Sequence, residues 1–114
     1  MYHLNQFPLN ISKVETEILN INCTVTIHKE QLSFMDAEIE IAIASSEELK
    51  NEQQRKAERI KLKQLPDYLQ TKSALTKVTE RRDKALIQLN LLRNQFSVAK
   101  LEARAAIINL EGVA

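Results

Sequence analysis

Two histidines are the first side chains to consider for metal binding or acid–base chemistry. Ferritin-like di-iron sites and zincin sites use the spacings E-x-x-H, H-x-x-H or H-E-x-x-H, which put the ligands on one face of a helix. His3 and His28 fit none of these spacings. The sequence therefore predicts no metal site and no cofactor.

The other candidates for catalysis are also isolated. Cys23 is a lone thiol with no basic residue within one helical turn to activate it, so no reactive thiolate is expected. Glu38 and Glu40 are two residues apart and point in different directions on a helix. Gly112 is the only glycine, so a glycine-rich phosphate loop is excluded. We expect no catalytic residues and a protein that is not an enzyme.

The composition shows which elements must carry these side chains. The chain has 114 residues, but only one Gly and two Pro. Because tight turns need positive or preset φ angles, a β-sandwich, a barrel and a Rossmann unit are unlikely. The sequence predicts an all-α fold of a few long helices.

Compartment and membrane association follow from the same composition. No apolar run approaches the ~18 residues of a membrane span, so no membrane contact is expected. The chain has one cysteine and no basic, then apolar, start typical of a signal peptide. A cytoplasmic location is the expectation.

Sparse helix signals divide the chain. Ser12 and Glu15 form the S-x-x-E pattern of a capping box, Pro66 and Asp67 give the one interior turn signal, and Gly112 suits a helix C-cap. These signals predict a leader at 1–11, a single helical hairpin at 12–114, and within it a first helix at about 12–64, a turn at 65–67 and a second helix at about 67–111.

Apolar residues recur in a heptad pattern through both predicted helices. With Ile11 and Tyr68 as position a, the a and d positions are mostly apolar over six or more heptads, which is typical of a coiled coil. Folding at 65–66 lets residue i face residue 131 − i, so that every a faces a d. Leu32 then faces Ala99, and His28, at a d position, faces Ala103. The fold class predicted is a long antiparallel two-helix coiled-coil hairpin.

Two local patterns leave alternatives open. Residues 18–28 alternate and are rich in β-branched side chains, as in a strand, although the heptad continues through them. Ser45-Ser46-Glu47-Glu48 resembles a second capping box, so the first helix could break there and give three helices.

Apolar side chains outside the seam predict self-association. Phe7, Leu9, Ile11 and Val14 would also overshoot the second helix and lack a partner within the chain. Exposed apolar surface of this extent favours a homodimer or larger homo-oligomer, most simply a four-helix bundle, or a dedicated protein partner. The alternative is that the leader folds back over its own hairpin. The predicted self-association residues are Leu19, Ile27, Phe34, Ile41, Leu91 and Val98.

The predicted hairpin tip is basic. Residues 49–84 contain eleven Lys and Arg but five Asp and Glu. Such a tip could contact the phosphate backbone of a nucleic acid or an acidic protein, and it could equally be a solvated face. Tyr68 is its only aromatic residue, so base stacking is not indicated. The possible contact residues are Arg55, Lys56, Arg59, Lys61, Lys63, Lys72 and Arg81.

Three segments carry a resemblance: residues 51–57 (NEQQRKA), residues 66–68 (PDY) and residues 93–104 (RNQFSVAKLEAR). Over roughly residues 50–105 the chain resembles uncharacterised small all-helical proteins of bacteria, cyanobacteria and phages. The resemblance implies a helical hairpin and supplies no site residues. We therefore expect a non-enzymatic oligomerisation or protein-interaction module, such as a scaffold or assembly subunit. The alternative is a nucleic-acid accessory protein.

Overall fold

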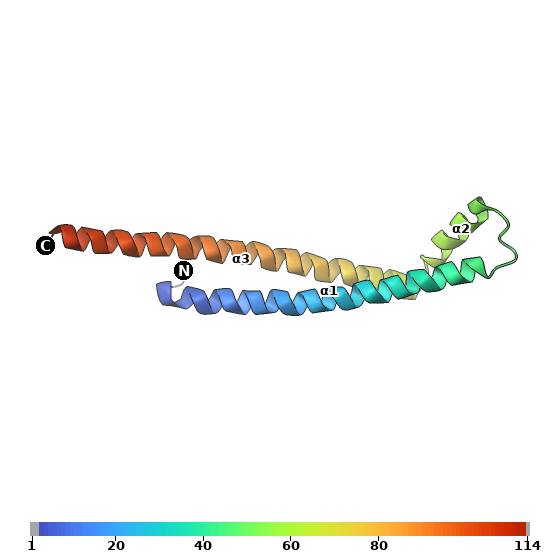
Figure 1. Cartoon of the computed structure of the whole chain (residues 1–114), viewed down its shortest axis with the longest axis horizontal. Helices are drawn as coiled ribbons and strands as arrows, with labels where there is room; N and C mark the ends of the chain where they lie inside the picture. The colour runs from blue at the N-terminus through green and yellow to red at the C-terminus, as the bar shows by residue number, and fades with distance from the viewer. Residues whose placement is uncertain (1–2, 114) are drawn as a thin grey trace. The chain divides into compact units, whose positions relative to one another are not determined.

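The computed structural model describes residues 3–113, and all the secondary structure in that range is helical (Figure 1). A short 3-10 helix, η1 (Leu4–Gln6), leads into α1 (Phe7–Ala44). A second helix, α2 (Glu52–Leu62), is followed by the long α3 (Pro66–Val113). The prediction of an all-α fold is confirmed for these residues. Residues 18–28 lie within α1, so the strand alternative is wrong.

The chain forms two compact units that each take part of α1 and part of α3. Unit 1 comprises Met1–Ile21 and Arg81–Ala114, and unit 2 comprises Asn22–Glu80, which includes α2.

α1 begins earlier than the sequence signals suggest. The prediction of a leader at 1–11 ending in a Ser12 cap is wrong, because the helix already begins at Phe7. The His3 backbone N–H donates to Gln6 Oε1 at 2.9 Å, which helps to close η1. Pro8 fits the first turn of α1, where its missing N–H would have no helical partner in any case.

The first helical arm ends at Ala44, so the predicted continuous helix over 12–64 is wrong. The break lies at Ser45-Ser46, as the open alternative allowed, but those serines do not cap the next helix. Asn51 does so: its side chain accepts a hydrogen bond from the Gln54 N–H at 2.8 Å. The Gln54 side chain in turn accepts from the Lys50 N–H at 2.7 Å. The N-x-x-Q pattern at 51–54 is therefore the sequence signal for the start of α2.

Residues 65–67 join two helices and do not reverse the chain. α2 ends at Leu62, and Pro66 is the first residue of α3, where a residue without an N–H is tolerated. In unit 2 the reversal lies instead between Ala44 and Glu52, and α2 already runs back beside the end of α1 (Figure 1).

α1 and α3 run antiparallel within each unit. In unit 1 Phe7 stacks on Phe96, with 5.5 Å between the ring centroids. In unit 2 the Tyr68 hydroxyl donates to Asp36 Oδ1 at 2.8 Å. Residue i therefore lies opposite a residue near 103 − i, and the predicted pairing of i with 131 − i is wrong. The shift of 28 residues is four heptads, which explains why an a position still faces a d position.

The buried core follows the predicted heptad phase. Ten of its twelve members belong to the a and d positions assigned above, Phe7 continues the series by one step, and Ile43 alone departs from it. Ile43 packs with Ile39 and Tyr68 where Leu49 and Leu62 also contribute. The buried residues are Phe7, Val14, Ile18, Ile21, Val25, Ile39, Ile43, Tyr68, Val78, Ala85, Leu89 and Leu92.

The overshooting arm in unit 1 is α3, and the prediction that α1 overshoots is wrong. Phe7 and Val14 are buried and Ile11 is half-buried, although Leu9 is exposed. Because Phe7 at the start of α1 stacks on Phe96, the rest of α3 extends past the start of α1 (Figure 1). Because the chain reverses at 45–51, α1 is shorter than the predicted first helix. Among the described residues, the end of α3 therefore has no helix opposite it.

Candidate interaction surfaces

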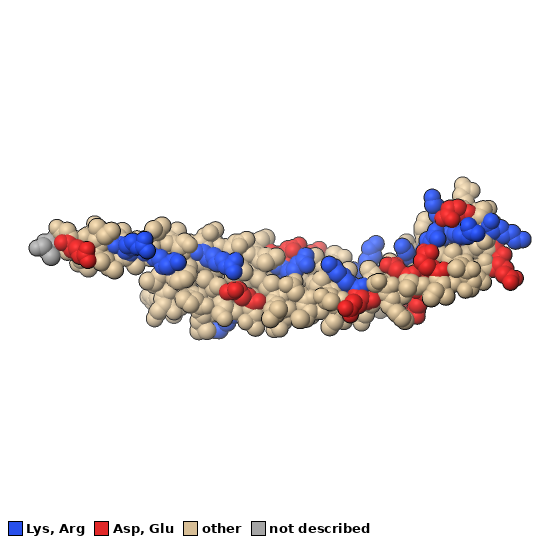
Figure 2. Space-filling view, viewed as in Figure 1, with Lys and Arg blue, Asp and Glu red and all other residues tan. Residues whose placement is uncertain are grey.

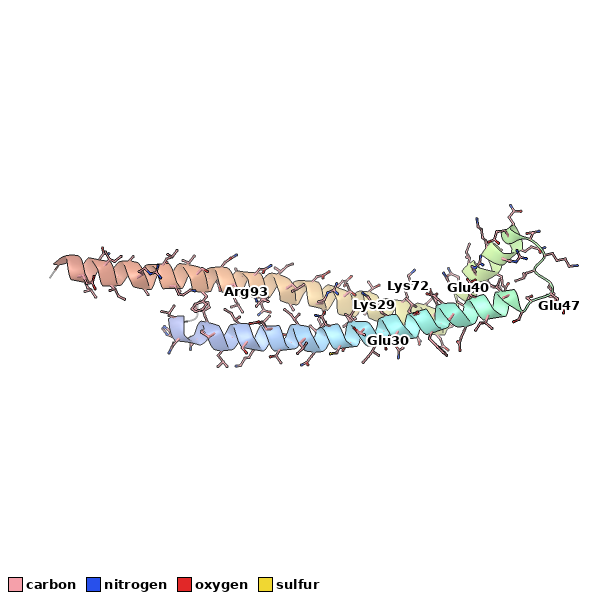
Figure 3. All side chains as sticks on the ribbon, viewed as in Figure 1. Lys29, Glu30, Glu40, Glu47, Lys72 and Arg93 are labelled. Carbon is pink, nitrogen blue, oxygen red and sulfur yellow. The ribbon has the colours of Figure 1, made fainter. Side chains whose placement is uncertain are left out.

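An ion-pair network joins α2 to α1 at the predicted basic tip. Arg59 donates to both carboxylate oxygens of Glu40, with Nε to Oε1 at 2.7 Å and Nη2 to Oε2 at 3.2 Å. Its Nη1 also lies 3.1 Å from Glu52 Oε1. Glu52 is in addition 3.6 Å from Arg55. Figure 3 shows Glu40 on α1 beside α2.

This network shifts the titration of its members. The hydrogen bonds from Arg59 lower the pKa of Glu40 and of Glu52 below the ordinary value. Hydrogen bonds to the same two carboxylates raise the pKa of Arg59. The charged forms are therefore favoured on both sides, as the two-pronged guanidinium–carboxylate geometry requires.

Ion pairs with carboxylates offset part of the positive charge that the sequence predicted for the basic tip. Arg55 and Arg59 are paired with carboxylates in unit 2, and Arg81 lies in unit 1, where it pairs with Glu17 at 3.6 Å. The four lysines among the seven predicted contact residues are exposed in unit 2: Lys56, Lys61, Lys63 and Lys72.

Unit 2 as a whole is not basic. Its residues 22–80 include nine Lys and Arg but ten Asp and Glu. α1 supplies Glu30, Asp36, Glu38 and Glu40. The predicted tip comprised residues 49–84 only, so its charge count left out these carboxylates of the first helix. Figure 2 shows both signs of charge interleaved over α2.

A groove in unit 2 lies beside the buried Tyr68. It has a volume of about 580 Å³ and is lined by Met35, Ile39 and Ala42 of α1 and by Leu62, Leu65 and Pro66 near the α2–α3 joint. Burial and the hydrogen bond to Asp36 raise the pKa of Tyr68. This contact could not be predicted from the sequence, because Asp36 and Tyr68 are far apart in the chain and do not face each other under the 131 − i pairing.

The predicted self-association residues are exposed, all six of them. Five of the six lie at heptad position c, three on α1 in unit 2 (Ile27, Phe34 and Ile41) and two on α3 in unit 1 (Leu91 and Val98). Leu19 lies at position b of unit 1. The prediction that these side chains avoid the seam is confirmed, but the structure divides them between the two units.

Polar contacts flank the seam on its e and g sides. Glu15 and Arg93, both at e, are 3.8 Å apart, and Glu17 and Arg81 are both at g. In an antiparallel coiled coil, g faces g and e faces e. Position c lies next to g on the helix surface. The exposed apolar row at position c therefore lies just outside the g side of the seam.

The residues considered for chemistry stay apart. His28 is half-buried, and its Nδ1 lies 3.2 Å from Gln31 Oε1. Cys23 is exposed. Within residues 3–113 no cluster of three or more His, Cys, Asp or Glu side chains could hold a metal ion. In the same range no helix is long and apolar enough to cross a membrane.

No protein-family model, curated protein or solved structure matches the chain. The resemblance to small all-helical proteins therefore stays a prediction, and function must be argued from the exposed surfaces.

Proposed function

We propose that the chain is a non-enzymatic self-association module whose α1 and α3 pair as an antiparallel coiled coil in each unit. The alternating a and d burial and the e–e and g–g ion pairs support this pairing. A scaffold or assembly subunit is the role that such a module fits.

The observation that carries the proposal is the row of exposed apolar side chains at position c. Phe34 is 66% exposed, and Ile27 and Ile41 lie one heptad to either side of it. Monomeric proteins scatter their exposed apolar residues, whereas a row at constant heptad spacing forms one stripe on a helix. A second copy that covers this stripe would give a homodimer with a four-helix core.

A matched pair of variants tests the stripe. Phe34→Glu puts a charge into the proposed contact, and burying that charge unpaired is costly. Ser33→Glu adds the same charge at the neighbouring position b, which is also exposed. Light scattering should show Phe34→Glu shifted towards monomer and Ser33→Glu unchanged. Equal masses for both variants and the wild type would contradict the proposed interface.

The alternative is a nucleic-acid accessory protein that uses Lys56, Lys61, Lys63 and Lys72. It has less support, because three of the seven contact residues pair with carboxylates and unit 2 carries no excess of basic residues. Phosphate contacts release counterions, so binding must weaken steeply with salt. A gel shift with duplex DNA and with RNA at two salt concentrations would reveal it, and absence of any shift at low salt would remove this alternative.

A further inference from the structure

Among residues 3–113, no helix lies opposite the last four turns of α3 in unit 1. We name residues 100–113 the C-terminal overhang. Its large apolar side chains Leu101, Ile107, Ile108 and Leu110 are all more than half exposed. Roughly fourteen residues make a helix about 21 Å long, a length that is marginal in water without packing.

The heptad pattern does not stop where the partner helix stops. Ala99, Ala103, Ala106 and Leu110 continue the d, a, d, a series that α1 covers further back at Leu89 and Leu92. The overhang thus presents the same seam face as the paired part of α3. A groove of about 540 Å³ marks the transition, lined among others by Leu4, Phe7, Val98, Ala99 and Ala103.

We propose that the C-terminal overhang pairs, antiparallel, with the C-terminal overhang of a second copy of this chain. This inference rests on the proposed self-association but adds a second, end-on interface, distinct from the stripe at position c. The partner's overhang takes the place in line with α1 that the early reversal at 45–51 leaves open.

The available space selects one register. An a position must face a d position, so the residue numbers of facing partners can sum to 202, 209, 216 or 223. A sum of 202 sets position 113 of the partner opposite Leu89, which is already buried, and a sum of 223 leaves only positions 110 and 113 to face each other. A sum of 209 sets the partner's Leu110 opposite Ala99, where Leu4 of the same chain lines the same groove and limits the space for a further helix. A sum of 216 avoids this crowding. Ala106 then faces Leu110 of the second copy, and Leu110 faces its Ala106.

Charge complementarity favours the same antiparallel arrangement. Arg104 and Glu111 both lie at position b, on the same side of the overhang seam. With the sum of 216, Arg104 of one copy comes beside Glu111 of the other, and this occurs twice by symmetry. A parallel pairing would put the two b positions on opposite faces of the dimer, so Arg104 would have no carboxylate of the second copy beside it.

Two matched substitutions test the seam. Leu110→Glu and Ile108→Glu each replace an exposed aliphatic side chain, 73% and 60% exposed respectively, but Ile108 is at position f, opposite the seam. Neither should affect folding of the paired region. Light scattering should show Leu110→Glu with about half the mass of the wild type, and Ile108→Glu with the wild-type mass. Equal masses for Leu110→Glu and the wild type would overturn the overhang pairing.

The outcomes separate this inference from the proposed function. If Phe34→Glu halves the mass and Leu110→Glu does not, the stripe at position c stands and the overhang pairing is wrong. If only Leu110→Glu halves it, the overhang is the interface and the stripe is not. A wild-type monomer at all concentrations would overturn both.

Directed crosslinking tests the register itself. In a Cys23→Ser background, a tagged Ala106→Cys chain is mixed with an untagged Leu110→Cys chain under mild oxidation. Because a disulfide needs Cα atoms within about 7 Å, the antiparallel register predicts mainly the mixed disulfide. Dominant crosslinking of each variant to itself would indicate a parallel arrangement and contradict the proposal.

Discussion

Phe7 stacks on Phe96 with 17° between the ring planes, and Phe7 is 1% exposed, the lowest fraction among the buried residues. The Nζ of Lys100 lies 4.4 Å from the centroid of the Phe96 ring. The contact ties the first turn of α1 to a point well before the end of α3. The register near 103 − i and the C-terminal overhang both follow from this relationship.

The register predicts which positions can be crosslinked within one chain. In a Cys23→Ser background, Leu32→Cys with Thr71→Cys should form an intramolecular disulfide on oxidation, since both positions are half-buried on facing seams of unit 2. Leu32→Cys with Ala99→Cys, which the 131 − i pairing would join, should not. Gel mobility before and after reduction distinguishes the two, and the reverse pattern would contradict the register.

Phe7 should contribute strongly to stability. Phe7→Ala removes a buried ring and leaves a cavity, which costs about 3 kcal/mol of unfolding free energy. Leu9→Ala, two residues away and exposed, should change it by less than about 0.5 kcal/mol. Thermal melts followed by circular dichroism measure both. A Phe7→Ala melt like that of the wild type would mean that the start of α1 is not packed on α3.

The network around Arg59 predicts a dependence of stability on acid. Glu40 and Glu52 have lower pKa values in the folded chain than the ordinary value of 4.5. Their contribution is therefore present above pH 4.5 and is lost as the pH falls through the folded-state pKa. Denaturation at pH 6 and at pH 3 should show a larger loss for the wild type than for Arg59→Gln. The same loss in both would mean that the network is not formed in solution.

Tyr68 predicts the opposite dependence at alkaline pH. Its pKa is raised above 10.0 in the folded chain, so its contribution is present below pH 10 and is lost as the pH rises through the folded-state value. Tyr68→Phe keeps the buried ring but removes the hydrogen bond to Asp36, which costs about 1 kcal/mol at neutral pH. Spectrophotometric titration of the tyrosines checks the shift, and a single ordinary tyrosine transition would contradict it.

The heptad pattern predicted the buried face of the helices but not their register. Val14, Ile18, Leu89 and Leu92 are buried as their a and d positions require. A periodic pattern looks the same after a shift of whole heptads, so the four-heptad error left each of these assignments intact. Only the position of the reversal distinguishes the registers, and Pro66 was a misleading marker because it also suits a helix start.

The candidate surfaces were predictable to different degrees. Exposure of Phe34 and Val98 followed from heptad position alone and needed no register. The pairing of Arg59 with Glu40 depends on where the chain reverses, so charge counting along the sequence overestimated the basic character of the tip. The C-terminal overhang depends on the same reversal, and the predicted register placed the unpaired end on the first helix instead of on α3.

The most direct test of the central claim is the molar mass of the wild-type chain by light scattering over about 1 to 100 µM, in moderate salt. Self-association through the exposed apolar surfaces predicts a mass that rises with concentration and reaches at least that of a dimer of the 13.1 kDa chain. A mass of one chain throughout this range would contradict the claim.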